Sequence, residues 1–214
     1  MIDKIKQKIN SLITEMENQE GSKVVMVDPS MMQMQEGPPE LRIIGLFADV
    51  TEENVAELIH ALLFLKESTL ALPPEEREPI DFYVSTYGGS ADDMFALYDI
   101  IRQIEPHIEI HTVGLGKVMS AGVLLLASGT KGKRKIGKYC RVMLHSAMAG
   151  SHGSLPNLVN EIEALQQTQE DYVSALASET NMTKKQLKNM LERKVNVYLS
   201  AEEAVELGIA DIII

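Results

Sequence analysis

From residue 41 onward, hydrophobic and polar residues follow two alternating periodicities. The runs LRIIGLF, IDFYVST and IEIHTVG are short, apolar and rich in β-branched or aromatic residues, as buried strands are. Between these runs, residues 51–67 and 91–104 repeat apolar side chains every three or four positions, which predicts amphipathic helices. Strands that alternate with helices favour a mainly parallel sheet with helical crossovers. We therefore predict an α/β fold.

The remainder of the chain continues this alternation. The small, apolar run VMSAGVLLLASG predicts a buried helix, TKGKRKIGKY a polar hairpin, and CRVMLHSAMAG a strand and a loop. From Ser154, apolar residues punctuate a long polar sequence at helical spacing, which predicts a protruding or half-buried helix. MTKKQLKNMLERK predicts another helix. In the final segment, Ser200 and Glu203 form a capping-box pattern and Gly208 marks a helix end before the last strand.

The first 40 residues have a different character. Apolar residues at helical spacing over residues 2–16 predict an amphipathic helix. Residues 24–27 resemble a short strand, and a stretch rich in Met, Gln, Gly and Pro predicts a flexible loop. We place a boundary near residue 40, which divides the chain into segments 1–40 and 41–214.

Charge and cysteine content narrow the classes of function. The 214 residues include 20 Lys and Arg against 31 Asp and Glu, a net charge of −11 that argues against nucleic acid as the main partner. Cys140 is the only cysteine, which excludes an intrachain disulfide and fits a reducing compartment. The N-terminus lacks a secretory signal pattern, and the longest apolar run is too short to cross a bilayer. We expect a cytoplasmic protein with no cofactor, metal or membrane partner.

Ser120 is the first candidate for chemistry. It lies in the sequence Gly116-Lys-Val-Met-Ser-Ala-Gly122, where a strand is predicted to turn into the buried helix. A hydroxyl among small and apolar neighbours needs a hydrogen-bond partner or a task. The amide of Ala121 at the helix start suits a developing oxyanion. The simpler interpretation is a serine that caps the helix.

His145 is the second candidate, because it ends the apolar strand VMLH. An imidazole can take the proton of a serine and return it to a leaving group if a third group sets its tautomer. A structural histidine in the core is the simpler interpretation. His152, in a nearby glycine-flanked loop, is the local competitor and is expected to be exposed.

Gly88 and Gly89 follow the predicted strand IDFYVST. Two glycines let the backbone approach a ligand closely, so the amide of Gly89 is a candidate for a second oxyanion donor. The backbone from Gly88 to Ser90 is also a candidate edge for an extended peptide substrate. The alternative is a tight turn with Ser90 as the N-cap of the next helix.

Taken together, these motifs resemble the Clp protease proteolytic subunit (the ClpP family) from about residue 41 to 214. The matching segments are LRIIGLFADV, STYGGS in place of a Pro-Gly-Gly turn, GKVMSAGVLLLASGTKGKR, RVMLH and LSAEEAVELGIAD. The resemblance implies a crotonase-like fold, a repeated β-β-α superhelix with a protruding handle helix at about residues 154–180. It also implies a serine endopeptidase that hydrolyses peptides and unfolded proteins inside two stacked heptameric rings of identical subunits, with an AAA+ ATPase unfoldase as partner.

By this resemblance, Ser120 corresponds to the nucleophile, His145 to the general base, and Gly89 with Ala121 to the oxyanion amides. The sequence departs from the family at Asn196, which stands where the family has an aspartate. A carboxamide can orient an imidazole but brings no charge to stabilise the imidazolium. Asp171 and Asp211 are possible substitutes that do not fit the motif. Residues 1–40 also differ from the family's axial-pore segment.

Three alternatives remain open at this point. The chain could be a catalytically weak or inactive ring subunit of a mixed complex, with Asn196 as the mark of a decayed triad. It could be a crotonase-type acyl-CoA enzyme, which needs the oxyanion amides without the serine and histidine. It could also be a related signal-peptide or capsid-maturation peptidase, for which Lys117 is the lysine adjacent to the motif.

Overall fold

The computed structural model describes residues 41–192 and 196–214, and residues 42–214 form one compact unit. The helix, strand and loop expected within residues 1–40 lie outside the described residues. The predicted boundary near residue 40 stays a prediction.

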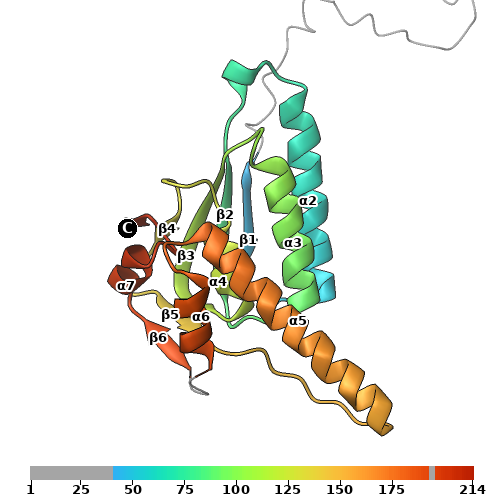
Figure 1. Ribbon diagram of the computed structural model, residues 1–214. Helices are drawn as coiled ribbons and strands as arrows, with labels where there is room; N and C mark the ends of the chain where they lie inside the picture. The colour runs from blue at the N-terminus through green and yellow to red at the C-terminus, as the bar shows by residue number, and fades with distance from the viewer. Residues whose placement is uncertain (1–40, 193–195) are drawn as a thin grey trace, which may run out of the picture. The chain divides into compact units, whose positions relative to one another are not determined.

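A mainly parallel sheet runs through this unit, as the alternating pattern predicted (Figure 1). Five strands follow the order β1-β2-β3-β4-β7, and every pair among them is parallel. The far end of β3 also pairs in parallel with β5, and β5 pairs antiparallel with β6. The strands are β1 (Ile43–Leu46), β2 (Ile80–Thr86), β3 (Ile110–Met119), β4 (Lys135–Ile136), β5 (Arg141–Leu144), β6 (Val197–Leu199) and β7 (Ile212–Ile213).

Helices connect the strands as crossovers, and several begin at residues with capping side chains. Thr51 and Ser90 each accept a hydrogen bond from the backbone of the third residue on, which starts α2 and α3. Ser200 and Glu203 form the capping box expected at α7. The helices are α2 (Glu52–Leu70), α3 (Ala91–Ile104), α4 (Ala121–Ala127), α5 (Leu155–Glu179), α6 (Lys184–Leu191) and α7 (Ala201–Glu206), with a short 3-10 turn at Pro74–Glu76.

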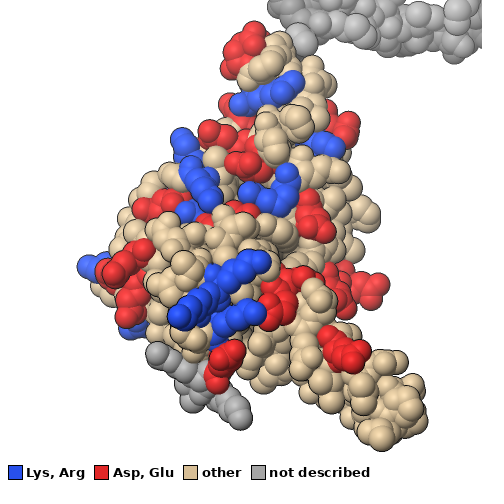
Figure 2. Space-filling model, in the orientation of Figure 1, with Lys and Arg blue, Asp and Glu red and all other residues tan. Residues whose placement is uncertain are grey.

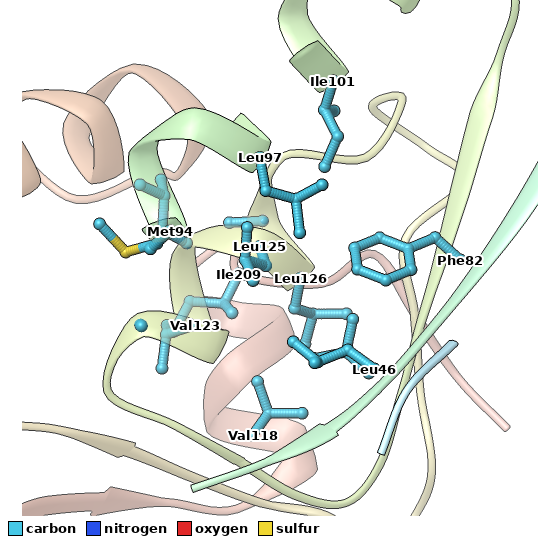
Figure 3. Packing of buried hydrophobic residues seen from close by; sticks show 14 of the residues in the cluster. Leu46, Phe82, Met94, Leu97, Ile101, Val118, Val123, Leu125, Leu126 and Ile209 are labelled. Carbon is cyan, nitrogen blue, oxygen red and sulfur yellow. The ribbon is translucent and has the colours of Figure 1, made fainter. Parts of the chain in front are cut away.

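The hydrophobic core lies between the sheet and α3, α4 and their neighbours. Figure 3 shows Phe82 of β2, Leu97 of α3 and Leu126 of α4 pointing toward one another, and all three are fully buried. Every residue of α4 is buried, which confirms the predicted buried helix for residues 121–127 of the apolar run. Burying a side chain of this size stabilises the fold by about 1.5–3 kcal/mol. The core therefore holds both ends of α4 in place.

Two predictions about local structure need correction. The run predicted as one buried helix begins as strand, because β3 continues to Met119 and α4 starts only at Ala121. The polar segment after α4 does not form a hairpin. Its short strand β4 pairs in parallel with β3 and β7, two strands that are distant in sequence. Tertiary pairing therefore overrode the local turn pattern.

Arg134 connects the end of the sheet to the ends of two helices. Its guanidinium donates to the carboxylate of Asp211 at 2.6 and 2.9 Å and to the carbonyl oxygens of Ala127 and Glu179 at 3.2 and 2.6 Å. These carbonyls lie at the ends of α4 and α5, where a cation is favourable. Arg134 thereby fixes the two helices relative to each other.

The first turns of α5 extend away from the sheet, at the lower right of Figure 1. Their side chains are mostly exposed, whereas Val173 and Leu176 near the other end are buried in the core. In the described part of the chain, no helix combines the length and hydrophobicity needed to cross a bilayer.

Candidate active site

Ser120 occupies the turn between β3 and α4 with an unusual backbone conformation. Its φ of 54° makes it the only non-glycine residue with positive φ among those described. Strained backbone of this kind persists where surrounding contacts hold it, and it concentrates at functional sites. The side chain does not cap α4, which argues against the simpler interpretation of a capping serine. It is therefore free to make a different contact.

The hydroxyl of Ser120 instead meets the imidazole of His145, which follows directly after β5. Ser120 Oγ and His145 Nε2 are 2.9 Å apart. The other ring nitrogen, Nδ1, lies 2.6 Å from the carbonyl oxygen of Ser146. A carbonyl can only accept, so Nδ1 carries the hydrogen and Nε2 of the neutral ring accepts from the serine. The structure thus joins the two sequence candidates in the tautomer that base catalysis requires.

Parallel pairing of β3 with β5 explains how residues 25 positions apart come together. Lys117, Val118 and Met119 pair with the successive residues Arg141, Val142 and Met143. The backbone N–H of Ser120 then donates to Met143 O at 2.8 Å. Both side chains therefore emerge from the same edge of the sheet.

Gly88 and Gly89 lie beside Ser120 in the turn from β2 to α3. A Cβ added to Gly88 would lie 2.6 Å from Ser120 Cβ, so only glycine permits this close approach. The carbonyl of Gly88 and the N–H of Ser90 are hydrogen-bonded to the backbone of Val50. Ser90 also caps α3 with its side chain. These bonds leave the amide of Gly89, rather than the main-chain groups of Gly88 and Ser90, available to a ligand.

The amides of Gly89 and Ala121 make no hydrogen bond to any other described residue. Both residues line the cavity that contains the Ser120 and His145 side chains, which has a volume of about 370 Å³. Unpaired donors beside a hydroxyl are the elements of an oxyanion site. The side chains that line the rest of this cavity are mostly apolar or uncharged, including Met94, Met148 and Leu165.

Asn196 is the one proposed triad member that the structure does not bring to the imidazole. Its side chain is exposed, and the hydrogen bond of His145 Nδ1 goes to the Ser146 carbonyl. Leu144 pairs with Val197, so continuing this antiparallel register would set Asn196 opposite His145. Asn196 therefore lies near His145 by strand register, but the described structure shows no hydrogen bond between Asn196 and the imidazole.

The other candidates for a role at the site are engaged elsewhere. Asp171 accepts from Gln167, and Asp211 pairs with Arg134. The ammonium of Lys117 lies 4.7 Å from the centre of the Tyr87 ring, an arrangement typical of a cation–π contact. His152 lies exposed in the loop, as expected. Cys140 is buried and burial raises the pKa of its thiol to about 11, so it stays protonated at neutral pH.

Sequence reasoning missed two side chains of α5 that support the site. Tyr172 donates to the carbonyl oxygen of Ser120 at 2.8 Å, and burial raises the pKa of its phenol, which keeps the donor proton in place. Gln169 accepts from the backbone N–H of Ala147 at 3.1 Å. A signal was present in the sequence, because Gln169 interrupts the apolar positions Ile162, Leu165, Tyr172 and Leu176 of the helix. A polar residue at such a position calls for a partner.

Comparison with known proteins identifies the family of the chain. The family model for Clp protease matches residues 30–214. The chain is 32% identical over 173 residues to the ATP-dependent Clp protease proteolytic subunit 1 of Prochlorococcus marinus subsp. pastoris, covering 81% of this chain and 83% of that protein. It is 30% identical over the same length to the proteolytic subunit 2 of Parasynechococcus marenigrum, with 81% and 83% covered. The chain therefore belongs to the Clp protease family.

Proposed function

We propose that the chain is a serine endopeptidase in which Ser120 is the nucleophile and His145 the general base. The observation that carries this proposal is the 2.9 Å contact between Ser120 Oγ and His145 Nε2, in the tautomer set by the Ser146 carbonyl. Membership of a family of proteases supports the same role.

In the proposed mechanism, Ser120 Oγ attacks the carbonyl carbon of a peptide while His145 Nε2 takes its proton. The amides of Gly89 and Ala121 stabilise the oxyanion of the tetrahedral intermediate. The C–N bond then breaks, and His145 returns the proton to the leaving amine. Water deprotonated by the same imidazole attacks the acyl-enzyme, which releases the acid and restores the hydroxyl of Ser120.

The substrate is proposed to bind as an extended strand beside Gly89, with the loop after His145 on its other side. The largely apolar cavity would accept one substrate side chain next to the bond that is cleaved. Because backbone pairing provides affinity without strong sequence preference, this arrangement suits peptides and unfolded proteins. It needs no metal or cofactor.

The architecture proposed for the protein is the crotonase-like superhelix, with α5 as the handle. Leu155, Val159 and Ile162 expose an apolar stripe on the outer part of α5. Figure 2 shows few charged side chains on this projecting part. Such a stripe favours a contact between copies of the chain, as in two stacked heptameric rings. The named relatives are ATP-dependent, so an AAA+ unfoldase is the proposed partner, and the cytoplasm the proposed location.

The proposal is tested with a fluorophosphonate probe, which labels activated serines, together with a peptidase assay. We expect the wild-type chain to be labelled and active, and Ser120→Ala to lose both properties. Ser178→Ala is the matched control, since Ser178 is exposed and its hydroxyl donates to the carbonyl of Ala175 in its own helix. Labelling that persists in Ser120→Ala would remove Ser120 from the role of nucleophile.

A catalytically weak or inactive ring subunit is the second candidate function. The observation that favours it is the uncharged Asn196, which makes no hydrogen bond to His145 among the described residues. An imidazolium without a neighbouring carboxylate is less stabilised. Peptidase assays on the chain alone and with an activating partner distinguish the candidates, because an inactive subunit stays inactive in both.

A further inference from the structure

The peptide group between Ser146 and Ala147 is hydrogen-bonded at both ends within the site. Its carbonyl oxygen accepts from His145 Nδ1 at 2.6 Å, and its N–H donates to Gln169 Oε1 at 3.1 Å. The carbonyl and the N–H belong to one conjugated unit. An acceptor on the N–H therefore strengthens the carbonyl as an acceptor, because hydrogen bonds in a chain polarise one another.

Three hydrogen bonds thus connect Gln169 to the nucleophile. They run from Gln169 Oε1 to the Ser146–Ala147 peptide, from that peptide to His145, and from His145 to Ser120 Oγ. The donor and acceptor roles agree along the chain of hydrogen bonds. The N–H of Ala147 donates to the Gln169 oxygen, and the N–H at His145 Nδ1 donates to the Ser146 carbonyl. No other orientation of the Gln169 amide satisfies the backbone N–H of Ala147.

Helix α5 holds Gln169 firmly in this position. The next turn carries Tyr172, whose hydroxyl donates to the Ser120 carbonyl, and Leu176 is fully buried in the core. Arg134 binds the last turn of the helix through the carbonyl of Glu179. One rigid element therefore contacts both the residue that bears the nucleophile and the peptide that holds the base.

We propose that Gln169 is a positioning residue for the reaction: acting through the Ser146–Ala147 peptide, its side-chain oxygen holds His145 in the tautomer that accepts the Ser120 proton. This inference rests on the proposed function of Ser120 and His145. It assigns to a main-chain amide and a glutamine the task that a carboxylate performs in a Ser-His-Asp triad.

The described residues that line the cavity around His145 carry no charged side chain other than the imidazole itself when it is protonated. Among the residues that line the cavity, the other titratable side chains are the phenols of Tyr87 and Tyr172, and none is a carboxylate or an ammonium. The Tyr172 hydroxyl is committed to the Ser120 carbonyl. Among the described residues, the partner of Nδ1 is the Ser146 carbonyl, so a change at the far end of this chain of hydrogen bonds should reach the imidazole.

The test compares Gln169→Leu, which removes the acceptor, with Gln169→Glu, which keeps an acceptor and adds negative charge. The readout is the pH dependence of the rate at which a fluorophosphonate labels Ser120. For Gln169→Leu we expect the labelling rate to fall by about tenfold, the scale of one lost hydrogen bond. We also expect the acid side of the pH–rate profile to shift to lower pH. For Gln169→Glu we expect a labelling rate within about threefold of wild type, with the acid side of the pH–rate profile shifted to higher pH.

Gln166→Leu is the matched control, since Gln166 is an exposed glutamine on the same helix, and it should behave as wild type. If Gln169→Leu has the labelling rate and the pH–rate profile of wild type, the inference is overturned and the proposed function stands. If both Gln169 variants lose the labelling rate equally and the pH–rate profile does not shift, Gln169 contributes only packing. That result would also overturn the inference.

The failure of the proposed function gives a different pattern. A wild-type chain that labels at Ser120 but cleaves no peptide contradicts the proposed function, and the labelling rates of the variants still decide the inference. A wild-type chain that is not labelled at all removes both proposals.

Discussion

The two halves of the candidate active site are built in different ways. On the nucleophile side, both main-chain groups of Ser120 are bonded: its N–H donates to Met143, and its carbonyl accepts from Tyr172 and Val123. On the base side, His145 leads into a loop in which Met148 is 79% exposed, and Asn196 across the strand pair is also exposed. Hydrogen bonds from β5, α4 and α5 thus hold the backbone of Ser120, the proposed nucleophile, while His145, the proposed base, leads into an exposed loop.

Because of this difference, substitutions on the two sides should affect the free energy of unfolding and the catalytic rate differently. A substitution that disturbs the nucleophile side also disturbs elements packed in the core, so it should lower both the free energy of unfolding and the catalytic rate. A substitution on the base side removes one or two hydrogen bonds near solvent, so it should lower the rate with little effect on unfolding. Three substitutions test this contrast, in addition to the tests of Ser120 and Gln169.

The largest effect is expected from Asp211→Asn, which leaves the buried guanidinium of Arg134 without its carboxylate. Arg134 is only 5% exposed at its side chain, and breaking a buried pair of this kind costs roughly 3 kcal/mol or more. Because Arg134 also binds the ends of α4 and α5, activity should fall with stability. Urea unfolding at pH 7 measures the first effect, and peptide hydrolysis the second. The exposed Asp99→Asn is the control, and a wild-type unfolding midpoint in Asp211→Asn would contradict the prediction.

This pair also predicts how stability depends on pH. Burial alone would raise the pKa of Asp211, but its hydrogen bonds to Arg134 and the charge of that guanidinium outweigh burial and hold the pKa below its usual 3.8. The stabilisation is therefore complete at pH values above 3.8 and is lost as pH falls through the lower folded value. The difference in stability between wild type and Asp211→Asn should shrink over that acid range. A difference that stays constant down to the acid transition would contradict this assignment.

A smaller effect is expected from Tyr172→Phe, which keeps the ring and removes the hydroxyl that donates to the Ser120 carbonyl. We expect a loss of stability of about 1 kcal/mol and a fall in kcat of about tenfold, because the strained turn loses one of its supports. Tyr139→Phe is the matched control, since Tyr139 is 86% exposed. Normal kcat in Tyr172→Phe would show that the hydrogen bond does not position the nucleophile.

The smallest effect is expected from Asn196→Ala. The imidazole already has an acceptor in the Ser146 carbonyl, so we expect kcat/KM to fall by less than about threefold and the unfolding midpoint to stay unchanged. Steady-state hydrolysis of a peptide by both chains measures this. A loss of a hundredfold or more would restore Asn196 to the third position that the family resemblance implies.

Much of the fold was predictable because the signals are local. Strand β2 and helix α3 have the bounds that the apolar pattern indicated, and the capping box at Ser200 formed as expected. The hairpin predicted after α4 was wrong, because β4 finds its partners in β3 and β7. Short polar strands carry little periodicity, so their pairing depends on neighbours far away in the sequence.

The same distinction applies to the site. By itself, the sequence indicated Ser120 and His145 as the two candidate residues, since a serine beside a buried helix and a histidine at a strand end are local anomalies that match a known family. Only the tertiary structure decided which groups contact the His145 imidazole and the backbone of Ser120. Gln169 and Tyr172 reach the site from α5, 22 and 52 residues away from the backbone atoms that they contact. Such contacts depend on how α5 packs against α4 and the sheet, and no local pattern encodes that packing.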